Sequence, residues 1–203
     1  MNRVHGFMKR IKGILLCGMS LFFVLLTGCG TVEIQDGVNL ILNKDDSLTV
    51  TVREDFPSGK YSIDELNRMN ESEVSVYNQQ AGEDRVEIVS SETDGEKISL
   101  TMNFKSWTDY TAMNRISMFE GTAVEAVKEG YQLSGTYTEV SGEMMKRELT
   151  DSDLEDRQLI IVNDPVTIHS HNKILYATEN VHVADNKKMA TVTGDETAIV
   201  VFK

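Results

Sequence analysis

The chain has 203 residues, and its 20 Lys and Arg against 32 Asp and Glu give a formal net charge of −12. Four of the bases and none of the acids lie in residues 1–28, so the rest of the chain carries 16 bases against 32 acids, a net charge of −16. A body this acidic repels phosphate groups, which argues against nucleic acid, and against membrane adhesion through basic patches.

Residues 1–28 have the three parts of a lipoprotein signal peptide. A basic stretch precedes an apolar run over 14–26, which is too short to span a bilayer comfortably. The next residues, Leu26-Thr27-Gly28-Cys29, resemble the lipobox of bacterial lipoproteins. The resemblance implies cleavage between Gly28 and Cys29 and a diacylglycerol, with palmitate-type acyl chains, on the Cys29 thiol. The membrane is then a partner through this lipid.

Cysteine usage agrees with this interpretation. Cys17 lies in the signal segment and Cys29 is assigned to the lipid, so residues 30–203 have no thiol for a disulfide, a zinc site or a nucleophile. Two or more acyl chains hold a protein firmly to a membrane. We therefore predict a lipid-anchored protein on the extracytoplasmic face of the cell membrane, with strand-like sequence beginning at Thr31 or Val32.

The first half of the body predicts hairpins and short capped helices. Alternating β-rich runs pair across polar turns as two hairpins, 38–42 with 48–52 and 85–90 with 97–105. Three capping residues mark the starts of helices: Ser62, Ser106 and Thr122. The runs at 48–52 and 98–102 lie 50 residues apart, which leaves open a duplicated ββα unit or a chance recurrence of a common motif.

The second half of the body is richer in strands. Residues 134–156 are turn-rich and acidic, and short strands with tight polar connections follow, as in an antiparallel meander. Six strands are predicted, at 159–162, 166–169, 174–178, 181–184, 189–193 and 197–202. No proline-rich linker divides the chain, so we predict a single extracytoplasmic α+β domain over 29–203, with a ββα-type part at 29–133 and a β-rich lobe at 134–203.

This order of lipobox, hairpin, capped helix and second hairpin resembles small lipoproteins of Clostridia-type Gram-positive bacteria. The residues that carry the resemblance are Tyr77-Asn78, Asp109-Tyr110, Asn114, Phe119-Glu120-Gly121-Thr122 and Gly130-Tyr131, and more loosely 174–176 and 200–203. The family has no assigned activity, so the resemblance implies a cell type and no reaction.

The three histidines of the body, His169, His171 and His182, are the candidate metal ligands. His169 and His171 share a face if one strand runs through both, and two imidazoles can begin a zinc or copper site. Two-residue turns at 171–172 and 179–180 would instead pair His169 with Ile174 and place His182 on the opposite face. We therefore predict exposed strand histidines and no cofactor, with His169 and His171 as weak metal candidates.

No motif predicts a catalytic residue. Residues 151–156 space their carboxylates as a calcium loop does but lack its glycine and its bidentate glutamate, and Thr150 with Asp153 fit a helix start better. A nucleophile elbow, a P-loop, a dinucleotide glycine pattern and a zinc-protease helix motif are all missing. With 32 acids, paired carboxylates alone specify nothing.

These observations favour a non-enzymatic binding or interaction module of the cell envelope, whose partner is an envelope protein, a wall polymer or a secreted cation-rich ligand. Two alternatives remain open. One is a metal-handling lipoprotein that uses His169 and His171, and the other is an envelope hydrolase with carboxylate chemistry.

Overall fold

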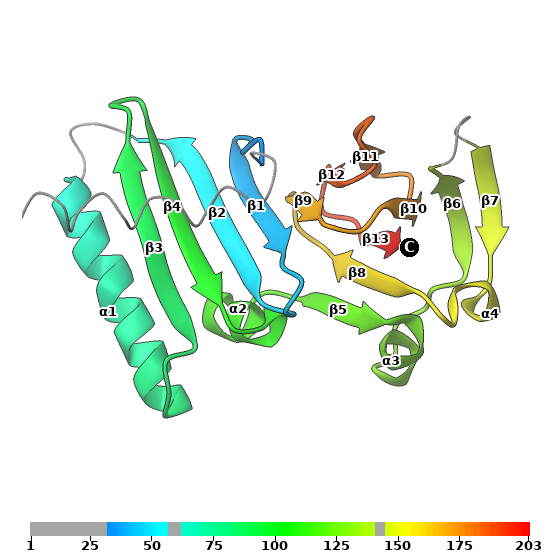
Figure 1. The fold of residues 1–203 in the computed structure, drawn as a ribbon, viewed down its shortest axis with the longest axis horizontal. Coiled ribbons are helices and arrows are strands. Elements are labelled where there is room, and N and C mark those ends of the chain that lie inside the picture. Colours follow the sequence, from blue (N-terminus) through cyan, green and yellow to red (C-terminus); the bar gives the residue numbers. More distant parts are fainter. Residues whose placement is uncertain (1–31, 57–61, 141–144) are drawn as a thin grey trace, which may run out of the picture. The chain divides into compact units, whose positions relative to one another are not determined.

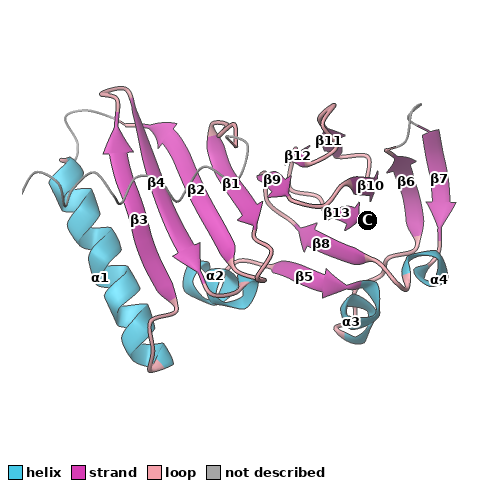
Figure 2. Ribbon diagram, in the orientation of Figure 1, coloured by secondary structure: helices cyan, strands magenta, loops and turns pink. Residues whose placement is uncertain are grey.

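Two β-sheets and four helices make up the part of the chain that the computed structural model describes, residues 32–56, 62–140 and 145–203 (Figure 1). The predicted α+β class is confirmed (Figure 2). Residues from Ile34 to Lys203 form one compact unit. The signal segment, including Gly28 and Cys29, lies outside the described residues.

Both predicted hairpins and all three predicted helices of the first half are confirmed. The elements are β1 (Gly37–Leu42), β2 (Leu48–Asp55), α1 (Ile63–Ala81), β3 (Val86–Thr93), β4 (Lys97–Phe104), α2 (Trp107–Asn114), β5 (Met118–Thr122) and α3 (Ala123–Lys128). The first strand within the described residues begins at Gly37, later than the prediction at Val32, and Thr31 lies outside those residues. Asn39 holds the preceding backbone by its side chain, outside any strand ladder.

The six strands predicted after residue 158 are also present. The elements of the second half are β6 (Gly135–Glu139), β7 (Met145–Leu149), α4 (Asp151–Leu154), β8 (Gln158–Val162), β9 (Thr167–Ser170), β10 (Ile174–Ala177), β11 (Val181–Val183), β12 (Met189–Val192) and β13 (Ala198–Phe202). Thr150 and Asp153 mark the start of α4, as their spacing predicts, because the Thr150 amide and hydroxyl both donate to the Asp153 carboxylate, at 2.8 and 2.6 Å.

Side-chain caps fix the helix starts. The Ser62 hydroxyl accepts from the Glu65 amide at 3.2 Å, and the Glu65 carboxylate accepts from the Ser62 amide at 3.0 Å. Thr122 and Glu125 repeat this capping box at α3. At the other end of α1, Gly82 takes a left-handed conformation with φ of 76° that side chains rarely adopt. Local sequence therefore determines where these helices begin and where α1 ends.

The strands are ordered β11-β12-β9-β1-β2-β4-β3 in the first sheet and β5-β8-β13-β10-β6-β7 in the second sheet. Only β1 and β9 pair in parallel among the described strands. The predicted boundary at residue 134 does not divide the sheets. Strands β9, β11 and β12 extend the first sheet, whereas β8, β10 and β13 join the second, because the short loops between them cross from one sheet to the other.

Apolar and polar residues alternate along the strands of the first sheet, so the sheet has one apolar face and one polar face. The apolar face contributes Leu40, Val50 and Met102 to a core that it shares with α1, α2 and one face of the second sheet. The other face of the second sheet packs against α3 and α4 in a second core. The terminal strand β13 lies between β8 and β10 with all five residues buried, so it is an interior strand of the second sheet.

Candidate functional site

His169 is buried on β9, with 7% of its surface exposed, and it hydrogen-bonds to a side chain from β1. Its Nε2 lies 3.2 Å from Oδ1 of Asn39. The Asn39 amide donates to the carbonyl of Gln35 at 2.8 Å, which fixes Oδ1 as the atom that faces His169. Because this oxygen can only accept, Nε2 carries the proton of the neutral ring. Burial lowers the pKa of His169 and favours this neutral form.

His171 and His182 lie apart from this contact. His171 follows the end of β9, is exposed, and places Nδ1 3.5 Å from the carbonyl oxygen of Leu42. His182 on β11 is exposed and pairs with Thr191. Thus two of the three predicted exposed histidines are exposed, while His169 is not.

The predicted pairing of His169 with Ile174 is wrong, and so is the placement of His182 on the opposite face. Strand β9 pairs with β1 and β12, and β10 belongs to the second sheet. The register puts His182 on the same face as His169, two strands away. Two strand spacings amount to about 9–10 Å, well beyond the reach of one metal ion.

No group of three or more His, Cys, Asp or Glu side chains that could hold a metal ion occurs within the described ranges. The weak metal candidates His169 and His171 have different hydrogen-bond partners. His169 is buried against Asn39, and His171 lies beside the carbonyl oxygen of Leu42. The geometry therefore brings no ready metal centre together around these two rings.

The polar face of the first sheet combines buried and exposed side chains: Asn39, Thr51, Thr167 and His169 are buried, whereas Asn103 is exposed. It is defined by the residues Asn39, Thr49, Thr51, Arg53, Ser99, Thr101, Asn103, Thr167, His169 and Thr191, which alternate with the apolar residues of the core. Hydroxyl contacts run across it, since the Thr49 hydroxyl donates to Oδ1 of Asn103 at 2.7 Å. Such a face offers hydrogen-bonding groups in fixed positions and no reactive group.

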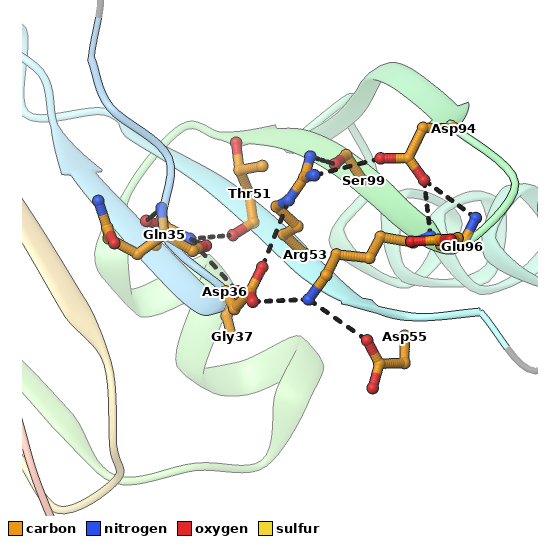
Figure 3. A network of polar contacts seen from close by, with 11 residues as sticks. Gln35, Asp36, Gly37, Thr51, Arg53, Asp55, Asp94, Glu96 and Ser99 are labelled. Atoms are coloured by element: carbon orange, nitrogen blue, oxygen red, sulfur yellow. Dashed lines mark hydrogen bonds and ion pairs between the residues drawn. The ribbon is translucent and has the colours of Figure 1, made fainter.

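An ion-pair network fastens the residues before β1 to one end of this face. Figure 3 shows Asp36, Arg53, Asp55 and Asp94 gathered there. Lys97 Nζ lies 2.6 Å from Asp36 Oδ2 and 3.3 Å from Asp55 Oδ1. Arg53 lies 3.4 Å from Asp36 and 3.2 Å from Asp94. The two cations are thus shared among three carboxylates.

The charges of this network act on one another. The hydrogen bond from Lys97 lowers the pKa of Asp36, and the same bond raises the pKa of Lys97. Backbone donors at Lys97 and Glu96 lower the pKa of Asp94. All three groups therefore stay charged over the physiological range. The network positions the Gln35–Asp36 backbone and leaves no free cation for an anionic ligand.

Two partly or fully buried carboxylates, Asp109 and Glu120, are among the residues that carry the family resemblance but were not predicted as site residues. Asp109, at the start of α2, accepts from the hydroxyls of Tyr77 at 3.0 Å and Ser106 at 2.7 Å, and Arg85 lies 3.8 Å away. Glu120 on β5 faces the core between the sheets, and burial, with a smaller effect of the Asp46 charge, raises its pKa to about 7. In the sequence, the available sign that Glu120 is buried was a single acidic residue among apolar neighbours.

Comparisons of the chain with protein-family models, with curated proteins and with solved structures found no significant match. None of the helices within the described residues is long and apolar enough to cross a membrane.

Proposed function

We propose that this protein is a lipoprotein held at the outer face of the cytoplasmic membrane by lipid on Cys29, where it acts as a non-enzymatic binding module. The observation that carries the proposal is the tetrapeptide Leu26-Thr27-Gly28-Cys29 behind a basic and an apolar segment. The resemblance to small lipoproteins of Clostridia-type bacteria supports the same assignment. Its partner is another component of the envelope, a protein or a wall polymer.

The chain after Cys29 supports a position close to the membrane. Gln35 is six residues beyond Cys29, and its amide and carbonyl are both bound by Asn39, at 2.9 and 2.8 Å. A chain spans at most about 3.3–3.6 Å per residue, so Gln35 can be no more than about 20 Å from the anchored cysteine. The start of the folded body would then stay close to the membrane surface.

The net negative charge of the body favours a cationic partner for this binding module. The body carries a net charge of −16, which repels anionic headgroups and attracts basic groups on an envelope component. The polar face adds fixed hydroxyl and amide groups that can orient such a partner, among them the exposed Asn103. Binding through this face needs no reactive residue.

The anchor is tested by labelling cells with a palmitate analogue and comparing Cys29→Ser with Cys17→Ser. We expect label on the wild-type chain and on Cys17→Ser, because Cys17 leaves with the signal peptide. Cys29→Ser should carry none and remain at the mass of the precursor. Label that persists on Cys29→Ser would refute the lipoprotein assignment.

The binding face is tested by a photoreactive residue placed at Asn103, with Lys128 as the matched exposed position on α3. Cross-linking in intact cells should give discrete adducts from position 103 and few from position 128. Equal patterns from both positions, or none from 103, would contradict a binding role for the polar face.

A further inference from the structure

A cavity of about 230 Å³ lies where β1, α2, β5 and β8 meet. Its apolar wall is formed by Val38, Leu40, Ile116, Met118, Val162 and Val166. These residues come from three segments of the chain, 38–40, 116–118 and 162–166, and four of the six are buried. The cavity is separate from the polar face, because Val38 and Leu40 point to the apolar side of the first sheet.

Two polar side chains stand at this cavity. Asp164, in the connection from β8 to β9, is exposed to solvent and lines the cavity. Tyr110 of α2 is buried and lines it as well. Burial, and after it the negative charge of Asp164, raises the pKa of Tyr110 to about 12. The phenol is therefore a neutral hydroxyl close enough to the carboxylate to sense its charge.

The carboxylate and the apolar walls together favour a positively charged ligand. A carboxylate beside apolar walls attracts an ammonium group and repels an anionic one, and the overall charge of −16 acts in the same direction. The Tyr110 hydroxyl can accept a second hydrogen bond from the same ammonium. A neutral apolar molecule would contact the apolar walls but leave the carboxylate without a partner.

The volume of the cavity limits the size of the ligand. An engineered apolar cavity of about 150 Å³ takes up benzene, whereas drug-sized ligands use about 300–1,000 Å³. A cavity of about 230 Å³ therefore suits a molecule of roughly six to nine non-hydrogen atoms.

We propose that this cavity binds a small monoamine, whose apolar group fills the space between β1, β5 and β8 and whose ammonium pairs with Asp164. The site is independent of the lipid anchor and of the polar face, so its failure would leave the proposed function untouched. For a ligand of this size we expect a Kd of about 0.1–1 mM.

The test is calorimetric titration of the full-length protein in nanodiscs of zwitterionic lipid, with empty nanodiscs as the blank. Benzylammonium is the probe, and benzyl alcohol is the neutral molecule of matched size. We expect saturable 1:1 binding of benzylammonium that is at least about tenfold tighter than that of benzyl alcohol. No saturable binding, or equal binding of the two molecules, would overturn the proposal.

Variants assign the binding to this cavity. Asp164→Asn should reduce the affinity for benzylammonium to that for benzyl alcohol, whereas Asp195→Asn, at an exposed loop position with the same change of charge, should leave it unaltered. Ile116→Trp should abolish binding of both molecules by filling the cavity. Since Asp164 is exposed, its variant remains informative even if Ile116→Trp fails to fold. Tight binding that survives Asp164→Asn would refute the assignment.

Discussion

The hydroxyl oxygens of Thr51 and Thr101 lie 3.0 Å apart, and the two residues pair directly across β2 and β4. They are also 50 positions apart in the chain. The same offset relates the hairpins on either side only as far as Ile88. Val38 pairs with Val52 and, fifty residues later, Ile88 pairs with Met102, but a bulge between Ile88 and Ser90 shifts the rest of β3 by one residue. A local two-fold axis therefore passes between Thr51 and Thr101.

This symmetry bears on the two explanations that the sequence leaves open. The pairing of β2 with β4, and that of the hairpins up to Ile88, is what a duplicated hairpin produces when two copies pair through their second strands, whereas β3 beyond its bulge departs from this register. The helices do not follow it, since α1 has 19 residues and α2 has 8, and their starts are 44 positions apart. The repetition is confined to the strands.

The first prediction concerns this hydroxyl pair. Replacing Thr51 or Thr101 by Val keeps the shape and removes one partner, at a cost of about 1 kcal/mol in the free energy of unfolding. The double variant should lose less than the sum of the two, with a coupling of about 0.5–1 kcal/mol in a double-mutant cycle from urea unfolding. Strictly additive losses would show that the hydroxyls do not interact.

The second prediction concerns His169. Burial lowers its pKa below the ordinary value of 6.5, so the unfolded state takes up a proton more readily than the folded state. Stability due to this group is therefore present above the ordinary pKa and is lost as the pH falls through the lowered folded value. His169→Gln should flatten the decline of the free energy of unfolding from pH 7 towards pH 5.

His182→Gln is the matched control for this measurement, because His182 is exposed on the same face two strands away. It should leave the pH dependence as in the wild type. If both variants change the slope equally, the buried contact between His169 and Asn39 is not its cause.

The third prediction concerns Glu120, whose pKa shift has the opposite effect on how stability depends on pH. Its pKa rises from 4.5 to about 7, chiefly through burial, so its contribution to stability is full below 4.5 and is lost as the pH rises through about 7. Glu120→Gln removes this loss and should raise the free energy of unfolding at pH 8 by up to about 3 kcal/mol.

The same substitution should have a much smaller effect at pH 4.5, where Glu120 is protonated in the folded state and about half protonated in the unfolded state. Glu92→Gln removes an exposed carboxylate on β3 and controls for net charge. Thermal unfolding of the three proteins from pH 4.5 to pH 8 provides the comparison. A gain at pH 8 that Glu92→Gln matches would be an effect of overall charge and would contradict the prediction.

Local signals were sufficient to predict the hairpins and helix starts, because capping and turn geometry depend on residues within four positions of one another, as at Ser62 and Glu65. Strands β5, β6 and β7 escaped prediction, and β7 shows the reason most clearly. Its residues Met145–Leu149 are mostly exposed and include Lys, Arg, Glu and Leu, which favour helix in isolation. Pairing with β6 makes this segment a strand, and that pairing has no signal in β7 itself.

Contacts between distant segments could not be predicted either. The partner of His169 is Asn39, 130 positions earlier, and the parallel pairing of β9 with β1 is what brings them together. The cavity likewise joins Val38 to Val166. Periodicity assigns each of these residues to a face of a strand, but only the order of the strands determines which faces meet.

The last prediction concerns the buried carboxylate that links α1 to α2. Asp109 is 6% exposed, and the Tyr77 hydroxyl donates to its Oδ1 at 3.0 Å. Tyr77→Phe keeps the ring but leaves that oxygen with only Arg85 nearby, at 3.8 Å. Leaving a buried acceptor without its donor costs about 1–3 kcal/mol, which urea unfolding would measure as a lower midpoint with an unchanged slope.

Tyr131→Phe is the control for the loss of a hydroxyl, because Tyr131 is half-buried against Phe119 in the second core, away from this carboxylate. Its free energy of unfolding should stay within about 0.5 kcal/mol of the wild type. Because Tyr77 belongs to α1, Tyr77→Phe should also speed amide exchange in α1 more than in α3. Equal losses from both substitutions, or exchange that rises uniformly, would show that the bond to Asp109 does not hold α1 in place.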